Sequence, residues 1–239
     1  SNQNTNNQQQ TADSNSRLSS SDVAAASNNR TSLVDITVPS VEATIIPDAT
    51  VQNDSNKDRN IVYMATLVDG ITADPQGNIY ISHRSQNRIR KLSPNGIITT
   101  IAGNGIAGFS GDGESALKSS LNFPAGLAFD KGNLYLADRN NHRIRKIDIN
   151  GIITTVAGVG VPGCCKDNGL AIDASLNFPS DVDIDLEGNL FISDRSNNRI
   201  RKVNASGIIS TIAGLGKPGF GGDFGPADKA LLKYPFGIS

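Results

Sequence analysis

The fold is decided by residues 124–160, which read PAGLAFDKGNLYLADRNNHRIRKIDINGIITTVAGVG. Four short runs rich in branched and aromatic residues alternate here with turn signals. The dipeptide Asn150-Gly151 is typical of a two-residue hairpin connection, and it separates the runs RIRKID and IITTVA. Apolar residues of NLYLAD and IITTVA fall at both odd and even positions, as in a sheet covered on both faces. The stretch therefore predicts four antiparallel strands whose two faces are both buried.

The same pattern repeats along the chain. Copies begin at about residues 68, 124 and 179, and a fourth opens at residue 235. Arg88, Arg143 and Arg199 occupy one position of the repeat, at intervals of 55 and 56 residues. Four antiparallel strands repeated at a fixed interval describe the blades of a β-propeller. We therefore predict an all-β fold, a partial β-propeller of four-stranded antiparallel blades, over residues 61–239.

Each copy carries an additional tract between blades. Residues 104–124, NGIAGFSGDGESALKSSLNFP, hold a Gly-rich loop followed by a segment with the composition of roughly two helical turns. Asp112 is placed to cap that helix, because a short acidic side chain accepts from the free amides of a helix start. A short helical and Gly-rich insertion in each repeat explains a period longer than the about 40–45 residues of a minimal blade.

Residues 1–60 differ in composition from the repeats. They are rich in Asn, Ser and Gln, and no aromatic residue precedes Tyr63. Such a segment buries too little apolar surface to offset the entropy of ordering it, so we predict a disordered tail or linker. The whole chain carries a net charge of −1 and has no apolar stretch long enough to span a bilayer. Its overall charge indicates neither nucleic acid nor an anionic membrane as partner.

The repeats resemble the NHL-repeat family, in particular the long-repeat form of microbial proteins and of teneurin-type propellers. The motifs that carry the resemblance are G-N-[IL]-[YF]-[IL]-[AS]-[HD]-R-x-[NQ]-[NH]-R-I-R-K, then [NS]-G-I-I-[ST]-T-[IV]-A-G, and L-[NK]-[FY]-P. The resemblance implies a six-bladed, TolB-like propeller. Three blades and the start of a fourth cannot close a ring, so we expect the remaining blades C-terminal to residue 239, with closure by pairing with a second copy as the alternative. It implies the fold and not the ligand, because propellers host unrelated activities.

One candidate metal site is a ring of equivalent residues. His83, Asp138 and Asp194 all end the second predicted strand of their copies, so they lie at similar radius around a propeller axis and would suit a cation. The alternative is that each Asp accepts hydrogen bonds from the amides of its own turn. The metal lyases of NHL-type propellers use several His ligands, whereas His83 and His142 here occupy different positions. We therefore predict no metal site, no cofactor and no enzyme activity.

The R-I-R-K runs supply candidate contacts for a partner or an anion, namely Arg90, Arg145 and Arg201. Some NHL propellers bind RNA through a basic face. Residues 61–239, however, hold 18 Lys and Arg against 16 Asp and Glu, and nucleic-acid sites usually combine clustered positive charge with stacking aromatics. The alternative role for these arginines is structural, as partners of aspartates in turns.

The Gly-rich loops diverge most between copies. They keep Asp112, Asp167 and Asp223 in register but fit neither the phosphate-binding nor the calcium-binding loop pattern. Cys164-Cys165 stands where the first copy has Phe109-Ser110. Cys164 and Cys165 are therefore candidate partner contacts, with the alternative that Cys164 fills the pocket of the phenylalanine.

These observations together predict a non-enzymatic scaffold that recognises a protein, or another macromolecule, through its loops and mouth. An RNA-binding propeller is the first alternative, and a metal-dependent lactonase or lyase is the second. An extracellular or cell-surface location is favoured over the cytoplasm.

Overall fold

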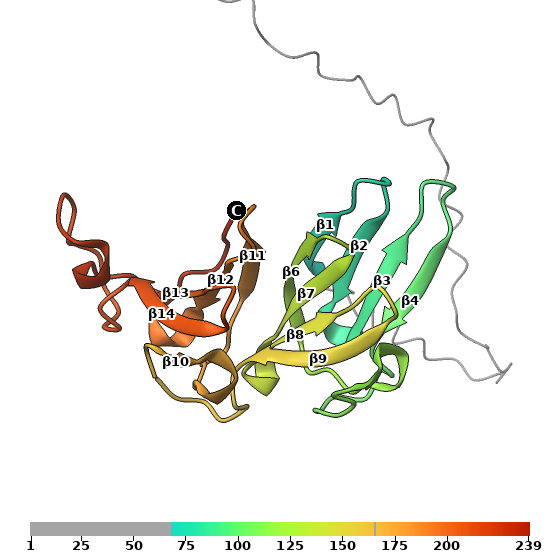
Figure 1. Cartoon of the computed structure of the whole chain (residues 1–239), viewed down its shortest axis with the longest axis horizontal. Coiled ribbons are helices and arrows are strands. Elements are labelled where there is room, and N and C mark those ends of the chain that lie inside the picture. The colour runs from blue at the N-terminus through green and yellow to red at the C-terminus, as the bar shows by residue number, and fades with distance from the viewer. Residues whose placement is uncertain (1–67, 165) are drawn as a thin grey trace, which may run out of the picture. The chain divides into compact units, whose positions relative to one another are not determined.

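The computed structural model describes residues 68–164 and 166–239, all within the compact unit Asn60–Ser239. The tail predicted over residues 1–60 lies outside the described residues. The described chain forms three antiparallel sheets joined by loops and three-residue 3₁₀ helices (Figure 1). Within this part of the chain, no helix has the length and apolar character to cross a membrane.

Each sheet has the same strand order. The first is β1 (Val68–Ala73), β2 (Ile79–His83), β3 (Arg88–Leu92) and β4 (Ile98–Ala102). The second is β6 (Pro124–Asp130), β7 (Asn133–Asp138), β8 (Arg143–Ile147) and β9 (Ile152–Ala157), with β5 (Glu114–Ser115) outside β9. The third is β11 (Asp181–Ile184), β12 (Leu190–Asp194), β13 (Arg199–Val203) and β14 (Ile208–Ala213), with β10 (Gly169–Leu170) outside β14. The predicted all-β partial propeller with four-stranded antiparallel blades is confirmed.

The 3₁₀ helices recur at two positions of the repeat. The turn between the second and third strands is η1 (Arg84–Gln86), η3 (Arg139–Asn141) or η5 (Arg195–Asn197). The tract after the fourth strand contains η2 (Ala116–Lys118), η4 (Ala171–Asp173) or η6 (Ala227–Lys229).

The first strands of neighbouring blades approach each other closely at glycine. The N–H of Gly126 in β6 donates to the carbonyl oxygen of Ser180 at 3.0 Å. A Cβ on Gly126 would collide with Asp181 of β11, and one on Gly70 of β1 would collide with the backbone of Ala125. Glycine is therefore required here by the close approach of two backbones.

The hydrophobic core lies between the blades. One cluster joins the first and second sheets and includes Ile89, Leu136 and Ile153. The other joins the second and third sheets and includes Ile144 and Ile192. Because the second sheet contributes to both clusters, its strands bury residues of both parities, as the sequence indicates.

The tract between blades differs from the expected two-turn helix. Glu114–Ser115 is a strand, β5, and Ala116–Lys118 alone turns as a 3₁₀ helix without a side-chain cap. The N–H groups of Gly113 and Ala116 donate to the carbonyls of Ile153 and Gly151, both at 2.8 Å. The outer edge of the next blade supplies backbone partners, so the tract pairs with that edge instead of coiling.

Candidate functional site

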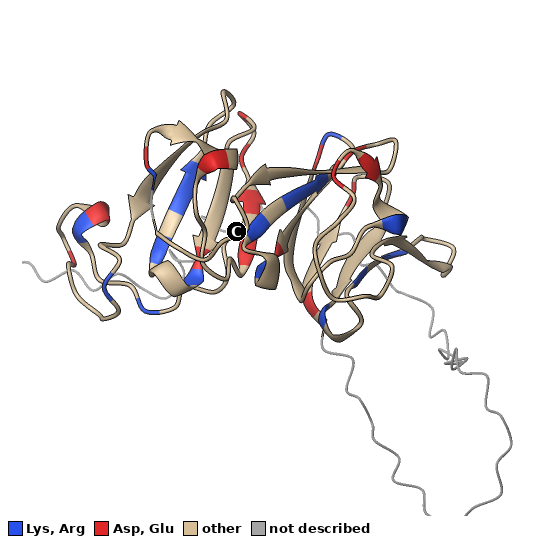
Figure 2. Ribbon diagram, turned by 90° about the horizontal axis from the view of Figure 1, so that it is seen from below, with Lys and Arg blue, Asp and Glu red and all other residues tan. Residues whose placement is uncertain are grey.

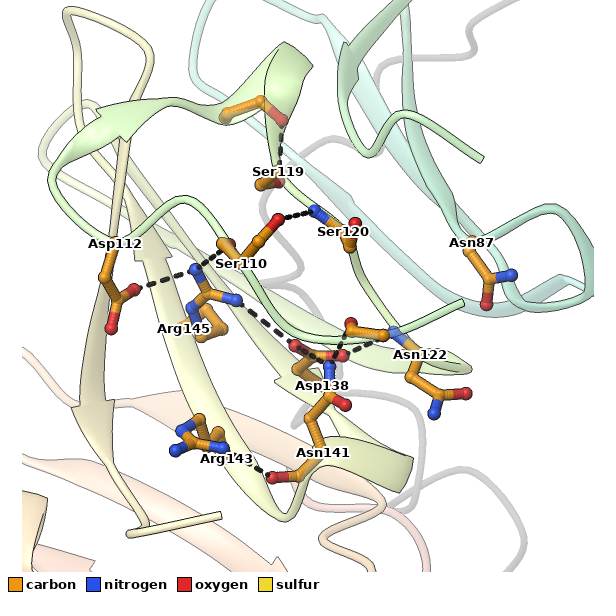
Figure 3. Close-up of polar contacts among 12 residues, drawn as sticks. Asn87, Ser110, Asp112, Ser119, Ser120, Asn122, Asp138, Asn141, Arg143 and Arg145 are labelled. Carbon is orange, nitrogen blue, oxygen red and sulfur yellow. Dashed lines mark hydrogen bonds and ion pairs between the residues drawn. The ribbon is translucent and has the colours of Figure 1, made fainter. Parts of the chain in front are cut away.

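Asp138 is the centre of a buried polar cluster at the end of β7. Its Oδ1 accepts from the N–H of Asn122 at 2.8 Å. Its Oδ2 accepts from Nδ2 of Asn141 at 2.8 Å and from Nη1 of Arg145 at 3.3 Å (Figure 3). Burial raises the pKa of Asp138 to about 6, although these hydrogen bonds and the charge of Arg145 oppose the rise. One carboxylate thus ties the inter-blade segment, the turn and β8 together.

The third blade repeats this cluster atom for atom. Asp194 accepts from the N–H of Asn177 and from Nδ2 of Asn197, each at 2.8 Å. It also accepts from Nη1 of Arg201 at 3.3 Å, and burial raises its pKa. Each Asp is a structural hydrogen-bond acceptor, as expected, but the backbone of its own turn is not the donor. The turn contributes an Asn side chain, and the backbone donor comes from the inter-blade segment.

The structure does not bring His83, Asp138 and Asp194 together as one group of side chains. Among the residues that the structure describes, no group of three or more His, Cys, Asp or Glu side chains can hold a metal ion. Each aspartate already accepts hydrogen bonds from its own blade and from the inter-blade segment before it. His142 is also occupied, because its Nδ1 accepts from the N–H of Phe178 at 3.1 Å.

Arg145 and Arg201 were candidate contacts for a partner, and the structure places them in the interior instead. Both side chains are 0% exposed. The second amino group of Arg145 pairs with Asp112 at 2.8 Å, and that of Arg201 pairs with Asp167 at 2.7 Å. Each arginine therefore bridges two aspartates, one from its own blade and one from the preceding loop, which is the structural role weighed for them.

Arg90 differs from its two equivalents. His83 stands in the place of the aspartate, and burial lowers its pKa, with a further contribution from the charge of Arg90. Among the described residues Arg90 has no acidic partner within ion-pair distance, and its side chain is half-buried. Arg90 therefore stays a candidate contact for a partner.

The loops before the second and third blades bind the blade that follows them. The ring of Phe109 lies over the guanidinium of Arg143, with Cζ 3.7 Å from the ring centroid. Cys164, in the place of Phe109, is exposed and disulfide-bonded. The only other cysteine of the chain, Cys165, lies outside the described residues. Their role as partner contacts stays a prediction.

Two sets of residues escaped the sequence analysis. The first is the loop of residues 219–226, in which the side chains of Phe220 and Phe224 are largely or fully exposed. Its signal was the second occurrence of the Gly-Phe-x-Gly-Asp pattern, which first appears at residues 108–112. The second set comprises the arginines that open the turns after the second strands, Arg84, Arg139 and Arg195. These were overlooked because charges of both signs are interspersed along the repeats (Figure 2).

Comparisons with known proteins agree with this architecture. Residues 121–147 match the NHL repeat. NHL repeat-containing protein 2 of Gallus gallus is 37% identical over 101 residues, which cover 41% of this chain and 14% of that protein. Teneurin-1 of Gallus gallus is 38% identical over 112 residues, which cover 44% of this chain and 4% of that protein. The chain thus spans a small part of the length of these relatives.

A solved structure shows the same fold. A protein of unknown function from Bacteroides thetaiotaomicron superposes with a TM-score of 0.56 at 21% identity, over 71% of this chain and 41% of that one. The matched NHL repeat runs from the inter-blade segment through β8, the stretch that contains the cluster around Asp138. The chain therefore carries the NHL repeat within a β-propeller fold.

Proposed function

We propose that this chain is a non-enzymatic recognition scaffold whose rigid blades present loops to a protein partner. The observation that carries this proposal is the pair of loops that precede the second and third blades. Each is held by the blade that follows, through an aspartate paired with a buried arginine. Their equivalent side chains Ile106 and Val161 nevertheless remain 67% and 64% exposed.

The contacts of the first loop show why it is held rigidly. The carbonyl oxygen of Gly108 accepts from Asn141 at 2.6 Å, and Asp112 pairs with Arg145. The residues that follow pair with the outer strand of the next blade as β5. A carboxylate on an arginine and strand pairing thus fix the loop before any partner binds.

Rigid presentation favours such binding. Loops that are ordered before binding lose little conformational entropy on association. Ile106 and Val161 occupy equivalent positions of neighbouring repeats, so they offer a partner an apolar contact that recurs from blade to blade.

The proposal is tested by quantitative capture with the full chain. The immobilised protein is offered extracellular and membrane protein extracts, and a captured protein is cross-linked and its affinity measured. We expect cross-links at residues 104–108 and 159–163. The double variant Ile106→Ser and Val161→Ser should weaken binding by about tenfold or more, since losing an apolar contact costs about 1 kcal/mol or more at each position.

The matched control is Leu186→Ser, which removes another exposed apolar side chain from the turn between β11 and β12. It should leave the affinity unchanged. Equal weakening by the control, or the absence of any saturable protein binding, contradicts the proposal.

The competing functions have distinct signatures. Retention of RNA whose affinity falls steeply with salt indicates the neutralisation of several phosphates and hence a nucleic-acid-binding role. Stoichiometric, tightly held metal together with turnover of a lactone indicates an enzyme. Either result would replace the scaffold role.

A further inference from the structure

Three equivalent arginines open the turns that follow the second strands. Arg84, Arg139 and Arg195 are the first residues of η1, η3 and η5. They come from three successive blades, and none of them takes part in the buried clusters around Asp138 and Asp194.

In the first blade this arginine has an acidic partner. Nη1 of Arg84 lies 3.0 Å from Oδ2 of Asp69 in β1. The strand registers pair Gly70 with Ser82 and Asp181 with Ser193, which identifies the residues equivalent to Asp69. They are Ala125 in the second blade and Ser180 in the third. Neither can neutralise a guanidinium.

The side chains of Arg139 and Arg195 consequently lack the carboxylate acceptor that Arg84 has in Asp69. Among the described residues, neither side chain donates a hydrogen bond or lies within ion-pair distance of a carboxylate, and the Nε of each is buried without a partner. The neighbouring Arg143 and Arg199, by contrast, donate to carbonyl oxygens of the following loops at 2.8 Å. Arg195 rests with its Cζ 5.0 Å from the ring centroid of Tyr234, which orients the guanidinium and leaves its charge in place.

Asp69 and its two equivalents lie next to one another across neighbouring blades. A Cβ on Gly70 would collide with Ala125, and the N–H of Gly126 donates to the carbonyl oxygen of Ser180 at 3.0 Å. Burial lowers the pKa of Arg139, and the charges of Arg195 and Arg84 accordingly add to this effect, while Asp69 acts in the opposite direction.

We propose that Arg139 and Arg195, together with Arg84, form a binding site for a small oxyanion, a carboxylate or a phosphate. A guanidinium presents a planar fork of donors that matches two oxygens of such a group. Partly buried donors without acceptors gain more from a ligand than donors that are already hydrogen-bonded to water. The site goes beyond the scaffold role and does not depend on it.

The test is an NMR titration of the full chain that follows the arginine Nε–Hε signals, with succinate and inorganic phosphate as separate probes. We expect saturable shifts of the Arg139 and Arg195 signals with at least one probe. Response to succinate alone assigns the site to carboxylates, response to phosphate alone assigns it to phosphates, and response to both shows a general oxyanion site. No saturable shift with either probe overturns the proposal.

Two pairs of variants separate the site from general charge effects. Ala125→Asp installs the carboxylate of the first blade and should weaken binding by about tenfold or more, whereas the isosteric Ala125→Asn should retain binding. Because Ala125 is buried, Arg139→Gln provides a second variant, with the same expected loss and with folding checked by circular dichroism. Lys217→Gln removes an exposed positive charge elsewhere and should leave the affinity unchanged. Equal affinity of Arg139→Gln and the unaltered chain contradicts the proposal.

Discussion

Asp138 and Asp194 show how a charged side chain becomes part of a propeller interior. Each is fully buried together with the arginine that it contacts. Burying two charges costs several kcal/mol of hydration, which their attraction and hydrogen bonds offset only when every polar atom is well placed. The additional aspartate from the preceding loop supplies a second acceptor for each arginine. Such a cluster specifies one arrangement of loop, turn and strand.

Replacing one member of the cluster should destabilise the protein strongly. Asp138→Asn leaves Arg145 buried with Asp112 as its only carboxylate, so we expect the free energy of unfolding to fall by about 3 kcal/mol. Urea denaturation measures this. The control Glu187→Gln, in an exposed turn, should change stability by less than about 0.5 kcal/mol. Similar stability of Asp138→Asn and the unaltered protein would show that the ion pair contributes nothing.

The carboxyl of Asp138 should titrate at unusually high pH. Its pKa is raised from 3.8 to about 6 in the folded protein. The folded state therefore binds more protons than the unfolded chain between about pH 4 and pH 6. The stability from this group is fully present below about pH 4 and is lost as the pH rises through about 6.

Carbon-detected NMR of the Asp138 carboxyl measures the midpoint directly. The difference in unfolding free energy between the unaltered protein and Asp138→Asn should shrink across the same pH range. A midpoint at or below 3.8, the ordinary value, or a difference that grows with pH, would refute this expectation.

Strands of adjacent blades meet at glycine, and this contact sets the spacing between sheets. A Cβ on Gly126 meets both the side chain and the Cα of Asp181, and overpacking of this kind costs about 1–3 kcal/mol. We expect Gly126→Ala to lower the melting temperature markedly. Gly169→Ala in β10 is the control, because its Cβ meets nothing closer than 3.7 Å. Equal melting temperatures would mean that the sheets can move apart without cost.

The inter-blade loop acts as an element of the following blade. Asp167→Asn removes the loop carboxylate that pairs with Arg201, and we expect a loss of about 1–3 kcal/mol in unfolding free energy. Asp223→Asn changes the equivalent residue of the last loop, which pairs with no described arginine, and should have no effect. Chemical denaturation of the two variants side by side tests this, and an equal effect of both would contradict it.

The strands were predictable and their accessory elements were not. Branched residues, hairpin turns and the exact repeat indicate β6–β9 directly. β5 and β10 have two residues each, too few for any periodicity, and they form because an outer strand edge lies beside them. In β8, which reads RIRKI, a β-bulge between Ile144 and Arg145 interrupts the alternation of side chains between the two faces of the sheet.

The candidate site was harder to predict than the fold. Arg145 belongs to a run that carries three charges in RIRKI, a composition typical of surface strands. Its burial depends on Asp112, which lies in another repeat and reaches it only through folding. The sequence shows that Arg84, Arg139 and Arg195 share one position of the repeat. Only the strand registers show that two of the three blades lack the acidic partner of this arginine.

At the scale of the molecule, and among the described residues, the outer strand of the first sheet is the least covered of the three outer strands. Ile153 and Ile209 are 0% exposed, whereas the equivalent Ile98 in β4 is 43% exposed. No described strand pairs with the outer edge of β4, while β5 and β10 cover the other two outer edges. Uncovered edges with apolar side chains promote pairing between molecules.

We therefore expect the chain to associate as its concentration rises, as measured by sedimentation velocity. Ile98→Lys places a charge beside the edge and should weaken association by about tenfold or more. Ile149→Lys, at an exposed turn position, serves as the control and should not. A chain that stays monomeric at all concentrations would show that β4 is protected.

The position of β5 and β10 in the chain has a consequence for biosynthesis. Each precedes the sheet that it completes, because β5 comes before β6–β9 and β10 comes before β11–β14. A ribosome releases the chain from its N-terminus, so the covering strand has already emerged when the outer strand of its blade appears. Each of these blades can close its edge as soon as it leaves the ribosome. Nascent chains on neighbouring ribosomes then meet finished blades instead of bare strands.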